Sequence, residues 1–182
     1  MIFVMRSICL LYTSFLTLAK KRYSVRAYKD QPVEEEKLRK ILEAGRVAPT
    51  GANKQPQHLI VVTSQQGRKK LDKAARTYGA PVVIIVCSQP EKTWTRPYDG
   101  KKLTDIDASI VTDHMMLEAT DLGLGSLWVC WFKEDVIRQE FSIPDGMVPV
   151  NLLAIGYAQG EPASPDRHED LRRPLEELVT FQ

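Results

Sequence analysis

Arginines near both ends of the chain have the type and spacing needed to bind a phosphate group. The segment RYSVR (residues 22–26) places two arginines four positions apart with a serine between them, and a second arginine pair follows at 172–173. A guanidinium group donates two parallel hydrogen bonds to phosphate oxygens, so arginine suits this task better than lysine. Taken alone, each segment is typical of a solvated basic turn. If the fold brings them together, they predict a single phosphate site.

Two turns that contain glycine suit a different part of a ligand. They read APTGANKQP (48–56) and GLGSLW (123–128). Glycine has no Cβ, so backbone N–H groups in such turns can closely approach the polar edge of a flat ring. Each turn alone is an ordinary feature. With the arginine segments, they predict a ligand that carries both a phosphate and a flat ring.

Several other kinds of site are not indicated. GLGS follows a predicted helix and precedes a strand, which is the reverse of a dinucleotide-binding fingerprint. His58, His114 and His168 are far apart, and no HxxxH or CxxC occurs, so we predict no metal site. No GxSxG elbow suggests a hydrolase. A net charge of +2 without a long basic run argues against nucleic acid as a partner.

Length and composition favour one ordinary globular domain. The chain has 182 residues, of which 43% are hydrophobic and 26% charged. We expect the domain over residues 14–182 and a dispensable extension over 1–13. The apolar start lacks a basic n-region and a cleavage site and is interrupted by polar residues, so neither export nor membrane insertion is expected. Cys87 and Cys130 lie in apolar runs and are expected to be buried and reduced, as in a cytoplasmic protein.

Helical and strand patterns alternate along the chain. Apolar residues on several sides of residues 105–122 predict a central, largely buried helix. The alternation predicts a sheet covered by helices on both faces, whereas the connections leave the strand directions open. We predict helices over 14–22, 33–47, 64–75, 105–122 and 133–141, and strands over 58–63, 81–87, 127–132 and 150–158.

In their order and spacing, these segments resemble the FMN-dependent nitroreductase family. The matching stretches are KKRYSVRAYKDQPVEEEKLRKILEAGRVAPTGANKQPQ, DHMMLEATDLGLGSLWV, FSIPDGMVPVNLLAIGYA and RRPLEELV, so the resemblance runs from about residue 14 to the end. It implies an α+β fold, a three-layer sandwich with a mixed central sheet flanked by helices. It also implies a homodimer with FMN at the interface between the two copies.

The resemblance further implies roles for individual residues. Arg22 and Ser24 match positions that hold the FMN phosphate and ribityl chain, with Tyr23 between them in the same site. Arg26 matches the position beside flavin N1 and O2, and Arg172 matches a C-terminal phosphate-binding arginine. The two turns supply the remaining expected contacts: Pro49, Thr50, Asn53 and Gln55 toward the FMN of the other subunit, and Gly125, Ser126 and Leu127 against the isoalloxazine ring.

The activity implied by the resemblance is that of an NAD(P)H-dependent FMN oxidoreductase. Electrons would pass from NAD(P)H through flavin N5 to nitroaromatic, quinone or similar acceptors in a ping-pong cycle. The cofactor carries this chemistry, so no catalytic side chain is expected beyond Arg26, which would stabilise the reduced flavin electrostatically. Two alternatives stay open: a specialised reductive dehalogenase or flavin-modifying relative, and a non-catalytic FMN-binding redox module. The sequence selects neither the acceptor nor NADH over NADPH. We expect no metal and no nucleic-acid or membrane partner.

Overall fold

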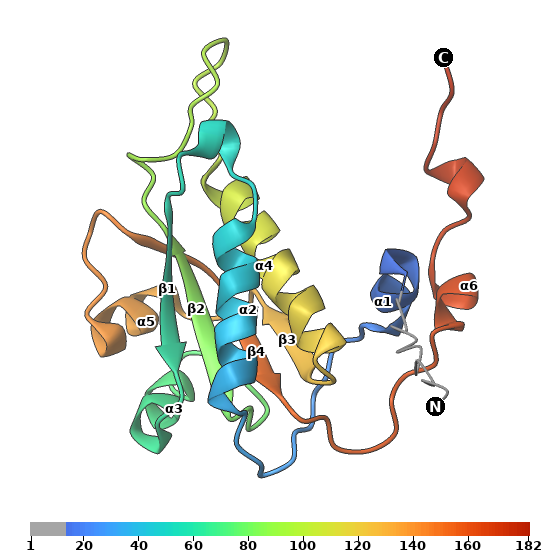
Figure 1. The fold of residues 1–182 in the computed structure, drawn as a ribbon. Helices are drawn as coiled ribbons and strands as arrows, with labels where there is room; N and C mark the ends of the chain where they lie inside the picture. Colours follow the sequence, from blue (N-terminus) through green and yellow to red (C-terminus); the bar gives the residue numbers. More distant parts are fainter. Residues whose placement is uncertain (1–13) are drawn as a thin grey trace, which may run out of the picture.

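A four-stranded antiparallel sheet forms the centre of the protein, in the order β1-β2-β4-β3 (Figure 1). The computed structural model describes residues 14–182, so the expected extension over residues 1–13 lies outside the described part. Within residues 14–182, no helix is both long and apolar enough to cross a membrane. The strands are β1 (Gln57–Val62), β2 (Val82–Ser88), β3 (Gly125–Val129) and β4 (Val148–Gly156).

Helices cover both faces of this sheet, which confirms the predicted three-layer α+β sandwich. The helices α2 (Glu35–Val47) and α4 (Thr104–Asp121) pack on one face, where Ile41, Met115 and Leu153 belong to one buried cluster. On the other face, α3 (Gln65–Leu71) and α5 (Glu134–Phe141) close over a second buried cluster. The strand β2, apolar from Val82 to Cys87, contributes to both clusters and is buried along its full length, as the sequence predicted.

The strand directions correct one detail of the expected mixed sheet. All four strands pair antiparallel, in the registers Ile60 with Ile85, Ile84 with Leu153, and Leu127 with Ala154. Among the described residues, the only parallel pairing is a single bridge between Ser24 and Ser126, beside the edge strand β3. The parallel component of the sheet within this chain is therefore limited to the RYSVR segment.

The edge strand β3 begins and ends earlier than the predicted strand 127–132. It starts at Gly125. A Cβ at this position would lie 2.6 Å from Val25 Cγ2, so glycine lets the RYSVR segment pack closely against the strand. The chain leaves the sheet after Val129, which makes Trp131 95% exposed. Cys130 is exposed as well, so its predicted burial is wrong, whereas Cys87 is buried as expected.

The predicted helix starts are largely confirmed. The Ser64 hydroxyl accepts a hydrogen bond from Gly67 N at 3.0 Å and thereby caps α3. The Ser14 hydroxyl caps α1 (Phe15–Lys21) in the same way. The long helix α4 is largely buried, as predicted: within Thr104–Asp121, only Asp105, Ile106 and Asp121 are exposed.

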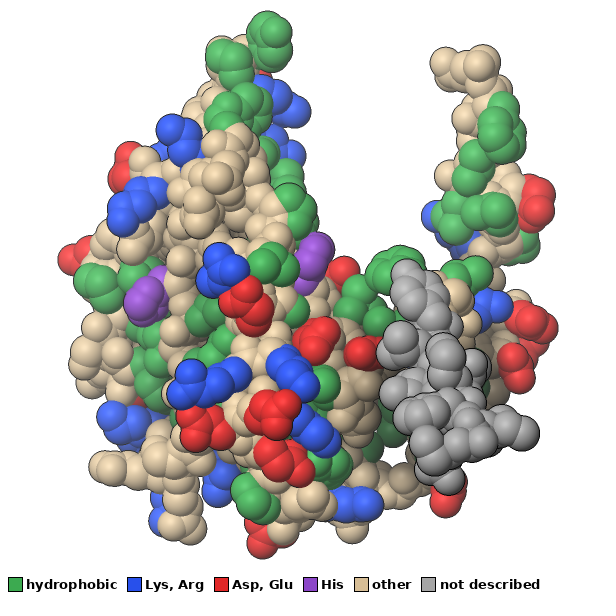
Figure 2. Space-filling view, viewed as in Figure 1, with side chains coloured by type: hydrophobic (Ala, Val, Ile, Leu, Met, Phe, Trp, Pro, Cys, Tyr) green, Lys and Arg blue, Asp and Glu red, His purple; other side chains and the backbone are tan. Residues whose placement is uncertain are grey.

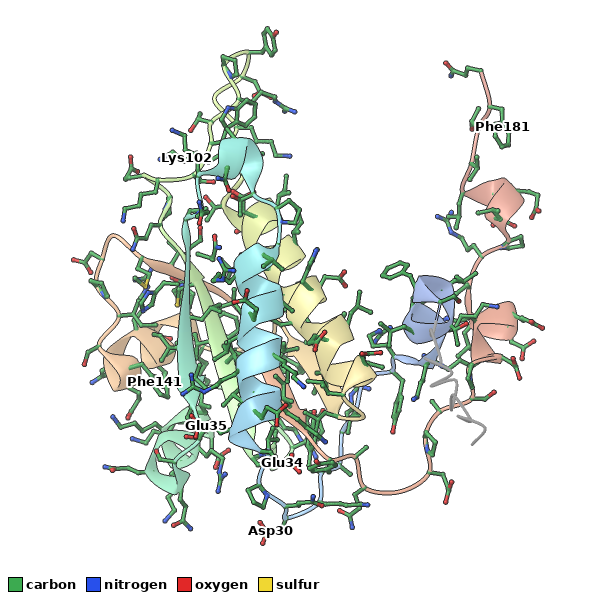
Figure 3. The ribbon with its side chains drawn as sticks, in the orientation of Figure 1. Asp30, Glu34, Glu35, Lys102, Phe141 and Phe181 are labelled. Carbon is green, nitrogen blue, oxygen red and sulfur yellow. The ribbon has the colours of Figure 1, made fainter. Side chains whose placement is uncertain are left out.

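A polar cluster fixes the start of α2 to the end of β4. The Tyr157 hydroxyl lies 2.8 Å from both carboxylate oxygens of Glu34, and Lys37 Nζ donates to the same hydroxyl at 2.7 Å. Glu34 is labelled at this end of the helix in Figure 3. These hydrogen bonds hold the N-terminal end of α2 in place, and the helix in turn positions the loop that follows its C-terminal end.

The end of the chain extends away from the sandwich. We call residues 164–182 the C-terminal arm; it contains the short helix α6 (Arg167–Leu171) and the 3₁₀ turn η2 (Leu175–Glu177). Figure 1 shows α6 beside α1, with the rest of the arm standing clear of the sandwich. Every residue from 169 to 182 is exposed. The arm is therefore placed by its first few residues, next to the RYSVR segment.

Candidate functional site

The RYSVR segment is an extended strip laid along the edge of β3. Val25 N donates to Ser126 O at 2.9 Å, and the Val25 side chain is buried. Side chains alternate along extended backbone, so Ser24 and its neighbours two positions away lie on the side opposite Val25. Arg22 is half-buried, while Ser24 and Arg26 are exposed. The segment thus buries its valine and leaves the arginines and the serine available to a ligand.

Tyr23 behaves differently from its neighbours. It is half-buried and packs against the hydrophobic cluster that contains Val25. It also lines a hollow of about 490 Å³ together with Arg22 and Gly125. Its ring contributes to the core, and so the arginines and serine are better placed than Tyr23 to contact a cofactor.

The start of the C-terminal arm brings two further arginines to Arg22. Burial lowers the pKa of the Arg22 guanidinium, and the positive charges of Arg167 and Arg172 lower it further. Asp113 on α4 opposes this effect more weakly. We call Arg22, Arg167 and Arg172 the arginine cluster. The structure therefore places the two arginines singled out from opposite ends of the sequence in one region.

Arg167 is a member of the cluster that the sequence did not reveal. Its Nη2 donates to Arg22 O at 2.5 Å, and its Nη1 donates to Lys20 O at 3.1 Å. The arginine lies in a proline-rich polar stretch with no periodic pattern, where nothing distinguishes it from a solvated residue. Arg173, by contrast, is not among the charges that shift the pKa of Arg22.

The cluster has the character of an anion site. Among residues 14–182, none of its three guanidinium groups forms an ion pair with a carboxylate. Like charges held together without a counter-ion raise the energy of the protein, and a bound anion offsets that cost. A phosphate, which accepts several guanidinium hydrogen bonds, fits this arrangement.

The turn at the start of β3 supplies a buried polar atom next to the same segment. Ser126 is 2% exposed, and its Oγ has no hydrogen-bond partner among the described residues. It is one of five buried side-chain polar atoms without a partner among the described residues, so it does not by itself mark a ligand site. Gly125 and Leu127 flank Ser126 on the strand. The flat-ring contact expected for these three residues stays a prediction.

Arg26 lies at the mouth of a different cleft. The cleft has a volume of about 510 Å³, and Arg26, Leu127, Tyr78, Trp131 and Phe132 are among its lining residues. Arg26 Nη1 donates a long hydrogen bond of 3.4 Å to Ser24 O. Arg76 and Lys133 also line this cleft, and cations beside a partly aromatic surface can hold a flat ring that carries negative charge.

The loop that holds Pro49, Thr50, Asn53 and Gln55 lies elsewhere. It contains the 3₁₀ turn η1 (Gly51–Asn53) and follows α2 at the end remote from α1 (Figure 1). Within one chain, the structure therefore does not bring these four residues to the arginine cluster. The expected contact with FMN would need the loop of a second copy.

This loop is conformationally strained. Ala52, Asn53 and Gln55 have φ angles of 47°, 53° and 48°, a left-handed region that costs L-residues on the order of 1 kcal/mol each. The Thr50 hydroxyl accepts from Gln55 N at 3.1 Å and closes the loop. Strain of this kind persists where the surrounding structure imposes it, and it occurs often at functional sites.

Asp107 provides that restraint from below the loop. Its side chain is 1% exposed; Oδ1 accepts from Gly51 N at 2.9 Å, and Oδ2 accepts from Thr93 Oγ1 at 3.2 Å. The sequence pointed to this aspartate only as a first-turn residue of a helix. Its contact with Gly51 joins residues 56 positions apart, which no local pattern predicts.

Comparison with known proteins gives the class of this chain. The Nitroreductase family model matches residues 19–78 and 74–157. A protein of Archaeoglobus fulgidus provisionally named NADH dehydrogenase/NAD(P)H nitroreductase is 33% identical over 155 residues, which cover 80% of this chain and 86% of the relative. The chain belongs to the nitroreductase family and is an oxidoreductase.

Solved structures agree with this assignment. A nitroreductase family protein of Clostridium difficile 630 superimposes with a TM-score of 0.91 at 58% identity, over 93% of this chain and 98% of the other. A protein of Clostridium difficile R20291 described as an FMN-dependent nitroreductase has a TM-score of 0.73 at 30% identity, over 90% and 96% of the two chains. The predicted family and fold are thus confirmed.

Replacing Asp107 by alanine tests the support of the strained loop. Because Gly51 N–H and the Thr93 hydroxyl would lose their acceptor, we expect faster amide exchange across residues 48–56. We also expect a loss of about 1–3 kcal/mol in the free energy of unfolding. Asp105→Ala is the matched control, since it removes an exposed carboxylate from the same first turn. Loop exchange that is equally fast in both variants would refute this role for Asp107.

Proposed function

We propose that the protein is an NAD(P)H-dependent FMN oxidoreductase that reduces nitroaromatic, quinone or similar acceptors by a ping-pong cycle. The observation that carries the proposal is the arginine cluster, whose guanidinium groups form no ion pair with a carboxylate among residues 14–182. The phosphate of FMN would be the anion that this cluster binds. The names of relatives add support, since they mention NAD(P)H and, in one solved structure, FMN.

The residues near the cluster fit the polar end of this cofactor. Arg22 and Arg172 would bind the phosphate, because each can donate two hydrogen bonds to it. Ser24 projects from the same side of the extended segment as Arg22 and would bind the phosphate or the ribityl chain. When bound, FMN would supply the hydride chemistry, and the protein would contribute binding, orientation and electrostatics.

The residues along β3 and in the adjoining cleft fit the ring. Gly125, Ser126 and Leu127 would contact the ring at this edge of β3, where glycine lets the backbone approach closely. Arg26 would lie near the pyrimidine end of the ring, where its fixed positive charge stabilises negative charge that develops on reduction. The exposed Trp131 lines the same cleft and would form one side of the acceptor pocket. Trp94, on the segment between β2 and α4, lies against Gly51.

The functional unit that we propose is a homodimer with FMN at its interface. The C-terminal arm carries apolar side chains that the described residues 14–182 leave exposed: Leu171, Leu175, Leu178 and Phe181 are 53–94% exposed. Figure 2 shows hydrophobic side chains along this arm, and Figure 3 labels Phe181 near its end. Exposed apolar surface of this kind marks a protein–protein contact. A second copy would cover the arm and bring its own loop 49–55 to the flavin.

Turnover is the experiment that tests the proposed activity. Purified protein supplied with FMN should oxidise NADH or NADPH steadily when a nitroaromatic or quinone is present. Double-reciprocal plots at several acceptor concentrations should give parallel lines, as a ping-pong cycle requires. Protein that binds FMN but shows no acceptor-dependent NAD(P)H oxidation would instead be a non-catalytic FMN-binding module.

Single arginine substitutions test the phosphate contacts. Arg22→Ala and Arg172→Ala should each weaken FMN binding by about 1.5–3 kcal/mol, because each removes charge-assisted hydrogen bonds. Titration of the apoprotein, followed by quenching of FMN fluorescence, measures the dissociation constant. Arg173→Ala is the control, since it removes the same charge one position away. Unchanged FMN affinity in both test variants would exclude the arginine cluster as the phosphate site.

The potential of the bound flavin tests the role of Arg26. Without this cation, the reduced flavin loses stabilisation, so Arg26→Ala should lower the midpoint potential by tens of millivolts, at roughly 30 mV per 1.4 kcal/mol. Arg76, which lines the same cleft and stacks on Tyr78 with its Cζ 4.7 Å from the ring centre, is the matched control. An equal shift in both variants, or none in either, would contradict the proposed position of Arg26.

A further inference from the structure

The guanidinium group of Arg167 donates three of its five N–H groups to main-chain carbonyls. Nη1 donates to Ser164 O at 2.6 Å and to Lys20 O at 3.1 Å, and Nη2 donates to Arg22 O at 2.5 Å. One side chain thus joins the start of the C-terminal arm to the segment that leads into RYSVR. The sequence separation is 145 residues for the contact with Arg22.

Among residues 14–182, few other interactions hold these segments together. Neither α1 nor α6 has a buried residue, so no apolar core fixes one against the other. His168 adds one contact, with its Nε2 3.2 Å from Lys20 O. From residue 169 onward the arm is fully exposed. The position of the arm therefore depends on the hydrogen bonds of Arg167 more than on packing.

The same hydrogen bonds place the backbone of Arg172, from which its guanidinium extends. Arg172 N donates to His168 O at 3.1 Å and ends α6, a helix that begins at Arg167. A short, continuous helix transmits the placement of its first residue to its last. Arg167 thus sets where the Arg172 guanidinium lies with respect to Arg22, even though the two groups repel each other.

We propose that Arg167 is a positioning residue for the anion site. It ties the arm to residues 20–22, so that Arg22 and Arg172 face one phosphate before the ligand arrives. This inference rests on the proposed function, in which that phosphate belongs to FMN. Arg167 would not itself be the main phosphate ligand, because both Nη1 protons and one Nη2 proton are already donated to carbonyls.

Only a planar group with several fixed donors can make these three bonds. An ammonium group on a flexible stem keeps the charge but cannot reach the three carbonyls in one geometry. Arg167→Lys therefore separates positioning from charge. If Arg167 acted on the phosphate through its charge alone, lysine would preserve much of the effect. If it acts by holding the arm, Arg167→Lys should weaken FMN binding nearly as much as Arg167→Gln.

The first measurement uses the apoprotein and needs no cofactor. Amide hydrogen exchange across residues 164–172 should be faster in Arg167→Lys and Arg167→Gln than in the wild type, with exchange in β2 unchanged. Arg173→Gln, which removes an exposed charge from the same arm, should leave exchange at 164–172 as in the wild type. Unchanged exchange in both Arg167 variants would overturn the proposed tie.

The second measurement is a double-mutant cycle on FMN affinity. Arg167→Lys should weaken FMN binding on the order of tenfold, because preorganisation of the site is lost. In an Arg172→Gln background, the same substitution should change the dissociation constant by less than about twofold, because Arg167 acts through Arg172. Equal losses in both backgrounds would overturn the inference, since they would show that Arg167 acts independently of Arg172.

The two measurements separate this inference from the proposed function. Wild-type protein that binds no FMN would refute the proposed function, and the tie would then be judged by amide exchange alone. Wild-type protein that binds FMN, with exchange at 164–172 insensitive to Arg167, would refute the tie and leave the proposed function standing.

Discussion

The site depends on the enforced proximity of like charges. Arg22, Arg167 and Arg172 come together from the two ends of the chain, and the pKa of Arg22 is lowered by burial and by both neighbours. No ion pair relieves them among residues 14–182. A fold that keeps such an arrangement must supply compensating contacts. Here these are the bonds from Arg167 to main-chain carbonyls and the strand-like pairing of Val25 with Ser126.

The rest of the fold can be understood as the frame for this arrangement. The edge strand β3 pairs with the buried strand β4, which in turn pairs with β2. Gly125 at the start of β3 has no side chain, so the RYSVR segment can pack closely against the strand. The helices α2 and α4 carry a strained loop at the opposite end, held by the buried Asp107. In the proposed function, these two separated regions belong to one cofactor site, and two copies of the chain would complete it.

Much of this fold could be predicted from local patterns. The apolar run of β2, the caps at Ser14 and Ser64, and the order of helices and strands follow from periodicity and hydrogen-bonding chemistry near each residue. Errors arose where a distant contact decides the outcome. The run LWVCWF reads as a strand, yet the chain leaves the sheet at Val129 and exposes Cys130 and Trp131.

The candidate site, too, was predicted only in the part that depends on local sequence. The type and spacing of residues in RYSVR indicated a phosphate ligand, and the resemblance to a family supplied Arg172. Arg167 and Asp107 escaped notice because each acts through a contact with a main-chain group far away in the sequence. A hydrogen bond between a side chain and a main-chain group far away in the sequence produces no periodic pattern in the sequence. Only the three-dimensional structure shows such positioning residues.

The affinity of the protein for FMN relative to riboflavin tests the central claim most directly, because the two ligands differ only in the phosphate. At low ionic strength, FMN should bind more tightly on the order of a hundredfold, the product of two charge-assisted arginine contacts. The difference should shrink as salt is added, since screening weakens exposed charges. Equal affinities for FMN and riboflavin at low salt would contradict the account.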